Sequence, residues 1–409
     1  MKQLVKNLVK LLSPILCGLF LCAVILGYLT PDALTTTTPD SAFVNGSFPL
    51  SLRYDHETAV TASASDHDQP TLKAQLMLLG FFPVKEVSVT LSEHREVYLG
   101  GQAFGLRLYT DGLVVSSVSE VPTQTGMVSP AADAGIEQGD ILLSVNGEPL
   151  RTNEQLLDTV TRRKAPLLLR VKRDERTFST TITPAYDIQT KSDKLGLHVR
   201  DSIAGIGTLT FIDPSNKSFA GLGHGICDAA SGCLMPLLDG DIVPISIQSV
   251  VKSLGGHPGT LCGSFADNTP QGTLSLNSDH GVYGHVNVLP TDQELIPVAF
   301  RQETVQGSAQ LICTVDESAV PCAYDIEIED ISYNNRQTVK NMVVRITDER
   351  LLRQTGGIVQ GMSGSPIVQN GQLVGALTHV FINDPTHGYA VFAENMTDFT
   401  DQLAVGTSP

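Results

Sequence analysis

Short apolar runs separated by turn residues dominate most of this chain and predict β-strands. Residues 87–91 (VSVTL) alternate between apolar and polar side chains, which is typical of a strand with one buried face. From about residue 194 onward, runs such as 206–212 (IGTLTFI) and 342–346 (MVVRI) are separated by glycine, aspartate, asparagine and proline, and few stretches keep a helical period. This part of the chain favours a β-sandwich or a pair of β-barrels.

A different order of elements is predicted between residues 96 and 187. The pattern predicts two strands at 104–108 and 113–118, followed by a short helix at 129–135. It then predicts a strand that ends in an Asn-Gly turn at 136–147, a longer helix at 152–163 and a further strand at 167–171. The short helix has proline near its first turn and glycine at its end, which are ordinary start and stop signals. The Asn-Gly pair is the strongest short hairpin signal.

The words SPAADAGIEQGDILLSVNG at 129–147 resemble a PDZ domain of the type found with bacterial proteases. The resemblance implies a module that binds a peptide as an added strand, with backbone amides capturing a C-terminal carboxylate. By position, Phe104, Gly105 and Leu106 are expected to form the carboxylate-binding loop. The alternative is that these residues are ordinary hairpin core and that the module only docks against its neighbour.

The beginning of the chain predicts a membrane anchor. Residues 11–29 carry no charge and follow Lys2, Lys6 and Lys10, and about 20 apolar residues span a bilayer core. The basic flank is expected to stay in the cytoplasm, which places the rest of the chain on the extracytoplasmic side of a single-pass protein. A cleavable signal peptide is the alternative, although its apolar region is usually only about 7–15 residues long.

The composition excludes several kinds of partner and ligand. The 43 acidic residues exceed the 27 basic ones and give a net charge of −16, so no nucleic-acid partner is expected. None of the seven cysteines shows the Cys-x-x-Cys spacing of a zinc site, and His56 and His67 are interpreted as solvated loop residues, so neither a metal nor a cofactor is expected. Outside the cytoplasm, Cys227–Cys233 or Cys313–Cys322 could form short-loop disulfides.

Residues 356–368 (GGIVQGMSGSPIV) are the strongest candidate for a catalytic site. A serine between glycines on a tight turn has an exposed hydroxyl, and successive backbone N–H groups there can converge on an oxyanion. The pattern Gly-x-Ser-Gly-x-Pro resembles the nucleophile region of chymotrypsin-like serine proteases. That resemblance implies Ser363 as nucleophile and the amides of Gly361 and Ser363 as the oxyanion hole, with Ser365 as the alternative nucleophile.

A serine hydroxyl needs a base within hydrogen-bond reach, and His224 is the candidate. It lies in 220–226 (AGLGHGI), where glycines on both sides leave the imidazole accessible. A histidine that precedes the serine along the chain also suits a double barrel with one catalytic residue in each half. His379, on the strand after the nucleophile, is interpreted as a wall of the specificity pocket or as core.

Four features together carry a resemblance to a known family, namely the N-terminal anchor, the PDZ pattern, the histidine motif and the long motif TGGIVQGMSGSPIVQNGQLVGALTHVFINDPTHGY. In these features the chain resembles the SpoIVB signalling serine peptidases of endospore-forming bacteria. The resemblance implies Ser363 and His224 as the catalytic pair and also implicates Asp348. In a chymotrypsin-like architecture the base-orienting aspartate belongs to the first barrel or its exit, whereas Asp348 is predicted to lie in the second. A dyad, or a role of Asp348 in holding the nucleophile loop, therefore stays open. Other candidates for the orienting role are Asp239, Asp241 and Asp279.

The expected fold is mainly β, with an N-terminal transmembrane helix, a PDZ domain and a C-terminal chymotrypsin-like double β-barrel protease domain. The resemblance implies a protein substrate, a membrane-bound regulator of an intramembrane protease. Its cleavage between the membranes of a developing spore would activate a late sigma factor, and self-cleavage is also implied. The alternatives are an HtrA-like quality-control protease and a catalytically inactive PDZ scaffold. The expected boundaries are 1–30 (anchor), 31–95 (linker and pre-PDZ region), 96–187 (PDZ domain) and 190–409 (peptidase domain).

Overall fold

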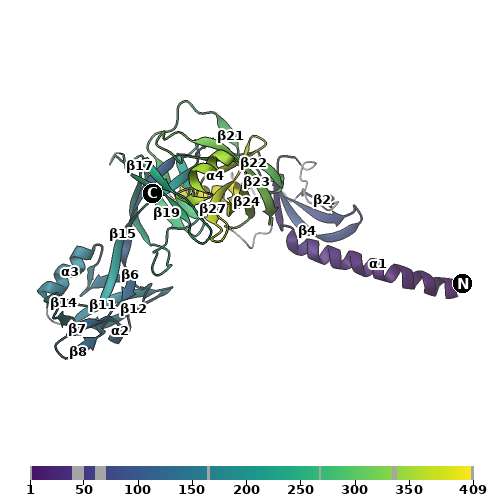
Figure 1. The fold of residues 1–409 in the computed structure, drawn as a ribbon. Helices are drawn as coiled ribbons and strands as arrows, with labels where there is room; N and C mark the ends of the chain where they lie inside the picture. The colour runs from purple at the N-terminus through teal and green to yellow at the C-terminus, as the bar shows by residue number, and fades with distance from the viewer. Residues whose placement is uncertain are drawn as a thin grey trace.

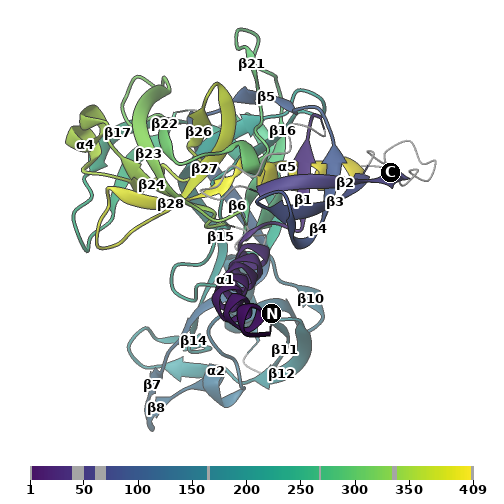
Figure 2. The ribbon, with the colours of Figure 1, turned by 90° about the vertical axis from the view of Figure 1, so that its right-hand side faces the viewer.

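The computed structural model describes residues 2–38, 50–59, 71–163, 166–266, 269–333 and 339–406. His67 lies outside these residues, so its interpretation is not addressed. The described chain is mainly β and has four parts, namely an N-terminal helix with a small sheet, an elongated module at one end, and two barrels (Figure 1). Figure 2 shows the second barrel and the N-terminal sheet on opposite sides of the first barrel, with the elongated module below.

The N-terminal part combines helix α1 (Lys2–Leu29) with a four-stranded sheet of order β1-β4-β3-β2. Its strands are β1 (Ala33–Thr36), β2 (Leu50–Ala59), β3 (Thr71–Leu78) and β4 (Phe82–Leu91). Leu26 near the end of α1 is buried against this sheet, Leu19 and Cys22 also pack on it, and the beginning of the helix projects away (Figure 1). Within the described residues no helix has the length and apolarity needed to cross a membrane, so the predicted transmembrane segment is not supported.

Six strands close the first barrel. Neighbours pair in the order β6-β15-β16-β20-β19-β17, and β17 pairs back onto β6. The strands are β6 (Ala103–Val118), β15 (Leu197–Ile212), β16 (Ser218–Gly221), β17 (Leu237–Val251), β19 (Gly272–Ser278) and β20 (Gly281–Val286). Both β6 and β15 have 16 residues, and this length lets each strand serve two parts of the molecule.

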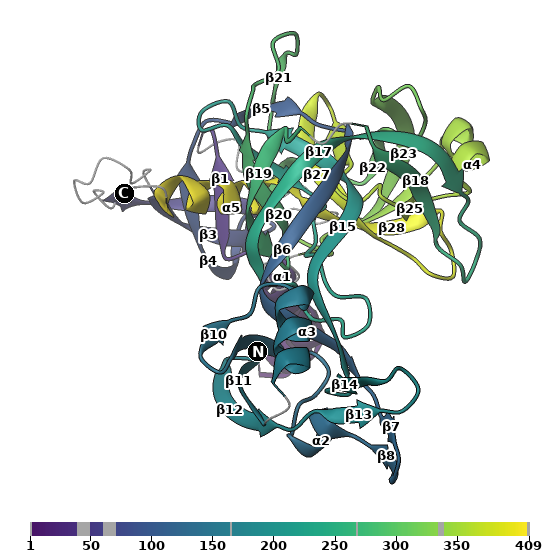
Figure 3. The same ribbon diagram turned by 90° about the vertical axis from the view of Figure 1, so that its left-hand side faces the viewer.

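The elongated module, here called the PDZ module, is built on the outer halves of β6 and β15, between residues 113 and 200 (Figure 3). Its other elements are β7 (Val121–Thr123), β8 (Gly126–Val128), α2 (Pro130–Asp133), β9 (Ile141–Val145), β10 (Glu148–Pro149), α3 (Asn153–Arg162), β11 (Leu167–Arg173), β12 (Arg176–Ile182), β13 (Ala185–Asp187) and β14 (Ser192–Lys194). The local predictions are confirmed. Pro130 opens α2, Thr152 makes a capping box at α3, and Asn146 and Gly147 turn the chain with φ of 52° and 86°.

The start of the region expected to be PDZ belongs instead to the first barrel. Phe104, Gly105 and Leu106 lie in the middle of a strand, paired with β15 on one side and β17 on the other. Phe104 and Leu106 are each only 3% exposed, in the core of this barrel. Because neighbouring strands occupy both backbone edges, this segment cannot capture a peptide carboxylate. The predicted carboxylate-binding loop is therefore wrong, and the PDZ module is an insertion after the first barrel strand.

The second barrel is closed, with strand order β22-β23-β24-β28-β27-β26. Its strands are β22 (Gly307–Cys313), β23 (Cys322–Ile331), β24 (Met342–Ile346), β26 (Pro366–Gln369), β27 (Gln372–Val380) and β28 (His387–Phe392). Apolar side chains that alternate along these strands, such as Leu311, Ile326, Val344 and Leu377, fill its interior. The prediction of two β-barrels is confirmed.

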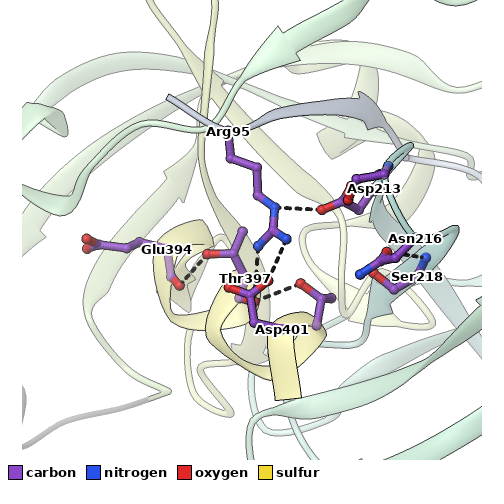
Figure 4. A network of polar contacts seen from close by, with 9 residues as sticks. Arg95, Asp213, Asn216, Ser218, Glu394, Thr397 and Asp401 are labelled. Carbon is purple, nitrogen blue, oxygen red and sulfur yellow. Dashed lines mark hydrogen bonds and ion pairs between the residues drawn. The ribbon is translucent and has the colours of Figure 1, made fainter. Parts of the chain in front are cut away.

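Arg95 fastens the C-terminal helix α5 (Ala393–Gly406) to the first barrel (Figure 4). Its Nε lies 2.6 Å from an oxygen of Asp213, and one Nη lies 2.5 Å from an oxygen of Asp401 on the helix. Asp213 is almost completely buried, so it depends on this cation for charge compensation. Because α5 packs on strands of both barrels, the ion-pair network helps to fix the barrels relative to one another.

The reassignment of Phe104 to the barrel core can be tested by truncation. We expect Phe104→Ala to lower the free energy of unfolding of the peptidase part by about 3–5 kcal/mol, because the side chain is enclosed and leaves a cavity. Tyr109→Ala is the matched control, since Tyr109 is 47% exposed on the same strand. Its cost in urea unfolding should be clearly smaller. A Phe104 variant as stable as the Tyr109 variant would contradict the placement.

Candidate active site

Ser363 lies on a turn that the second barrel presents to the first. The turn runs from β25 (Val359–Gln360) to β26 and contains two glycines in the left-handed region, Gly361 at φ 102° and Gly364 at φ 92°. A Cβ on Gly364 would lie 2.1 Å from the carbonyl oxygen of Thr208, so only glycine allows the turn to approach the first barrel this closely.

Two threonines of β15 clamp this turn. The Thr208 amide donates to the Ser363 carbonyl at 2.9 Å, and the Thr208 hydroxyl donates to the Gly361 carbonyl at 2.8 Å. The Thr210 hydroxyl donates to the Gly364 carbonyl, also at 2.8 Å. Both threonines are completely buried, so each of these bonds satisfies a group that water cannot reach. A strand of the first barrel thus holds the candidate nucleophile of the second.

His224 reaches the same place from the strand next to β15. Strand β16 pairs with β15 and ends at Gly221, after which Leu222 and Gly223, both at φ 66°, turn the chain into His224. A Cβ on Gly364 would lie 2.4 Å from the Leu222 nitrogen, and one on Gly223 would lie 2.8 Å from a methyl group of Thr378. The two glycine-rich motifs predicted from sequence are therefore in direct contact across the barrels.

The polar groups of the pair are not bonded to one another in this resting arrangement. The Ser363 hydroxyl donates to the Thr378 carbonyl at 2.9 Å, and His224 Nδ1 lies 2.9 Å from the Gly225 carbonyl. The second contact requires a proton on Nδ1, which leaves Nε2 as the basic nitrogen. Loose catalytic contacts are common before substrate binds.

His379 stands beside His224, with ring centroids 4.9 Å apart. Burial lowers the pKa of His224, and the hydrogen bond to Gly225 opposes this only in part. Burial also lowers the pKa of His379, and the neighbouring His224 and Lys340 lower it further. Both rings are therefore neutral near pH 7, and a neutral imidazole is what a general base requires.

Asp348 has a capping role, and in the described chain its carboxylate is not hydrogen-bonded to His224. Its carboxylate begins helix α4 (Glu349–Thr355), accepts from the Arg350 amide at 2.7 Å and pairs with the Arg350 guanidinium, also at 2.7 Å. The oxygen that pairs with the guanidinium, Oδ2, also accepts from the Asp325 amide at 3.3 Å. The hydrogen bond with the Arg350 side chain is the main reason that the pKa of Asp348 falls to about 2. Through α4, Asp348 supports the segment that leads to the nucleophile.

The remaining candidates for the orienting or nucleophilic role are also placed. Asp241 is paired with Arg107 at 2.7 Å, and Asp239 is exposed and bonds its neighbour's amide. Asp279 lies exposed on the turn between β19 and β20, and in the described chain none of the three is hydrogen-bonded to His224. Ser365 is completely buried and donates to the Met362 carbonyl at 2.6 Å, so the structure excludes it as nucleophile.

The cysteines of this half are free thiols in the structure. Cys227 pairs with Leu234, whereas the Asp228 amide bonds to Cys233, so Cys227 and Cys233 point to opposite faces of their hairpin and the first expected disulfide is not supported. Cys313 and Cys322 are direct cross-strand neighbours on β22 and β23, and no disulfide joins these two residues in the structure.

The PDZ module has at its end a groove that was not predicted from the sequence, here called the peptide groove after the role proposed for it below. Helix α3 and the start of β15 enclose a groove of about 340 Å³ lined by Leu156, Val160, Leu195 and Leu197, among others. Gly196 turns into the strand at φ 70°, and its carbonyl accepts from the Ser119 amide. In the described residues β15 pairs with β6 along 197–200 and has no strand on its other edge there. The sequence signal for this groove was the triplet Leu195-Gly196-Leu197, which has the same apolar-Gly-Leu pattern as Phe104-Gly105-Leu106.

Comparisons with known proteins match these two parts of the chain. The family model described as SpoIVB peptidase S55 matches residues 191–397, which include His224 and Ser363, and a PDZ domain model matches 127–173. A Bartonella henselae protein named as a zinc metalloprotease is 32% identical over 91 residues, 22% of this chain and 24% of that protein. The chain thus spans about a quarter of the length of this curated relative.

Two solved structures show more distant similarity. The active form of the Rv3671c protease from M. tuberculosis has a TM-score of 0.30 and 17% identity, over 51% of this chain and 76% of that one. The PDZ domain of the SdrC-like protein (Lmo2051) from Listeria monocytogenes has a TM-score of 0.19 and 20% identity, over 22% of this chain and 90% of that one.

The lowered pKa of His224 predicts the pH dependence of activity. A base works when it is neutral, so activity should fall only as the pH drops through the pKa of His224, which lies below the ordinary histidine value of 6.5. We expect the acid limb of the kcat/KM profile to be centred below pH 6.5. A rate profile with its acid limb centred at or above pH 7 would contradict the burial argument.

The capping role of Asp348 predicts a loss of stability rather than of chemistry. Asp348→Ala should lower the free energy of unfolding by about 1–2 kcal/mol, whereas Asp348→Asn, which still caps, should cost less. Because the pKa is about 2 in the folded chain against 3.8 ordinarily, the carboxylate stabilises fully above about pH 4 and loses this effect as the pH falls towards 2. A fall of about 10⁴-fold in kcat for folded Asp348→Asn would instead indicate a triad member.

Proposed function

Since the chain belongs to the SpoIVB peptidase S55 family and is a PDZ-containing serine peptidase, we propose that Ser363 and His224 are its catalytic pair. The observation that carries this assignment is the contact between their two turns, in which Gly364 abuts Leu222. Gly223 of the histidine turn also abuts Thr378 on β27, whose carbonyl holds the Ser363 hydroxyl. The β15 clamp supports it, because the clamp fixes the serine turn on the strand next to the one that leads to the histidine.

The proposed reaction is acyl transfer to serine followed by hydrolysis. His224 Nε2 takes the hydroxyl proton, and Ser363 Oγ leaves the Thr378 carbonyl and bonds to the carbonyl carbon of the substrate peptide. The amides of Gly361 and Ser363 stabilise the oxyanion, and His224 then gives its proton to the leaving amine. Water, deprotonated by the same histidine, attacks the acyl-enzyme and releases Ser363.

We propose that the substrate is a membrane-bound regulatory protein cut outside the cytoplasm during endospore formation, and that the chain also cleaves itself. Membership of the family supports the signalling role. We further propose that a peptide C-terminus binds the PDZ module at residues 195–199, beside helix α3, instead of at Phe104, Gly105 and Leu106.

Two alternative functions, a quality-control protease and an inactive scaffold, would require different properties of this site. An HtrA-like quality-control protease would degrade unfolded proteins broadly, and an inactive PDZ scaffold would not need an accessible serine. The half-buried Ser363 and the neutral histidine beside it favour a working enzyme over a scaffold.

Substitution of the two neighbouring serines separates these functions. We expect Ser363→Ala to abolish fluorophosphonate labelling, casein digestion and self-cleavage, with a loss of about 10⁴-fold or more. Ser365→Ala is the matched control and should keep most activity, because its buried hydroxyl donates to the Met362 carbonyl within the turn and does not face substrate. Full activity in folded Ser363→Ala would refute the mechanism, and a wild-type protein without any labelling would favour the scaffold.

A further inference from the structure

The segment that follows His224 folds into a hairpin that rests on the PDZ module. Cys227 pairs with Leu234, the Asp228 amide donates to the Cys233 carbonyl at 2.9 Å, and the Gly232 amide donates to the Asp228 carbonyl at 2.8 Å. We call residues 224–235 the histidine hairpin. His224 is its first residue, so a displacement of the hairpin that reaches Gly225 and Ile226 also moves the candidate catalytic base.

The carboxylate of Asp228 is the centre of the contact. It is completely buried, yet it lies 2.8 Å from Nε of Arg200 and accepts from the Ser116 hydroxyl at 3.2 Å. Arg200 belongs to the PDZ half of β15, and Ser116 belongs to the PDZ half of β6. Burial alone would raise the pKa of Asp228, but hydrogen bonds from Ser231 and Ser116 and the charge of Arg200 outweigh it and lower the pKa.

Further contacts hold the hairpin on both sides. From the PDZ module, the Gln138 side chain donates to the Ala230 carbonyl at 2.6 Å, and a Cβ on Gly139 would lie 2.8 Å from the Cys233 sulfur. From the first barrel, Asn277 bonds both backbone groups of Ile226, at 2.9 Å and 3.0 Å. The barrel thus fixes the base of the hairpin, and the PDZ module fixes its tip.

The contact between Arg200 and Asp228, here called the hairpin anchor, also adjoins the peptide groove. A second cavity, of about 500 Å³, lies between the PDZ module and the hairpin and is lined by Ser116, Arg200 and Ala230. It shares Asn153, His198 and Val199 with the peptide groove. Arg200 follows the groove residues directly along β15, which runs on into the barrel (Figure 3).

We propose that Arg200 and Asp228 are positioning residues of the active site, through which the PDZ module holds the hairpin that carries His224. The catalytic centre is then assembled from three parts of the chain, the two barrels and the inserted module. The proposal rests on the proposed role of His224 as base. Loss of the hairpin anchor frees the tip of the hairpin and lets the segment that carries His224 shift. A misplacement of about 1 Å at a catalytic group can lower the rate by up to about 100-fold.

The test measures labelling of Ser363 in the full chain by a fluorophosphonate at several probe concentrations, together with thermal unfolding. We expect Arg200→Met and Asp228→Asn each to lower the maximal labelling rate about 10-fold, with the half-saturating probe concentration changed less than about twofold. Arg200→Lys should recover most of the rate, because it restores the positive charge beside Asp228. Arg107→Met is the matched control, since it breaks the Arg107–Asp241 pair of the first barrel, away from the hairpin. It should lower thermal stability without slowing labelling.

A folded Arg200→Met variant that is labelled at the wild-type rate would overturn the proposal, as would an equal loss in Arg107→Met. If Arg200→Met does not fold, Gln138→Ala gives the answer, because this exposed side chain bonds the tip of the hairpin and its removal should slow labelling about two- to threefold. An unchanged labelling rate in Gln138→Ala would overturn the proposal that the PDZ module positions the hairpin. Labelling of His224→Ala at the wild-type rate would instead overturn the proposed function, and the anchor with it.

Discussion

The arrangement of this molecule depends on the clamp that β15 places on the serine turn. Three hydrogen bonds from Thr208 and Thr210 reach carbonyls of the turn, in a region from which water is excluded. An unsatisfied buried partner costs about 1–3 kcal/mol, so the turn has one strongly preferred position. Since the adjacent strand β16 leads directly to His224, the same pair of strands sets both halves of the catalytic pair.

Strand β15 also connects the PDZ module structurally to the candidate active site. Its first residues form the free edge of the peptide groove, Arg200 anchors the histidine hairpin, and Thr208 and Thr210 clamp the serine turn. Backbone pairing with β6 runs along most of this length, with irregularities between His198 and Val199 and between Arg200 and Ser202. The insertion therefore shares its two supporting strands with the barrel instead of meeting it across a flexible linker.

Local signals made much of this structure predictable. The proline and glycine around α2, Thr152 before α3 and the glycines around His224 and Ser363 each dictate their own backbone. Phe104-Gly105-Leu106 was misassigned because an apolar triplet in a strand looks the same whether a peptide or another strand lies beside it, and pairing with distant β15 and β17 decides. The groove at 195–197 had a local signal, the triplet Leu195-Gly196-Leu197, and the support that Asp348 gives through α4 agrees with the role in holding the nucleophile loop that the sequence left open.

The most direct test of the clamp is a crystal structure of the fluorophosphonate adduct of Ser363. The account predicts that a phosphonyl oxygen lies about 2.7–3.1 Å from the amides of Gly361 and Ser363, with His224 Nε2 within about 3.2 Å of the oxygen bonded to Ser363. The bonds of Thr208 and Thr210 to the turn should remain. An adduct whose His224 ring faces away from the modified serine, or whose turn has left β15, would contradict the account.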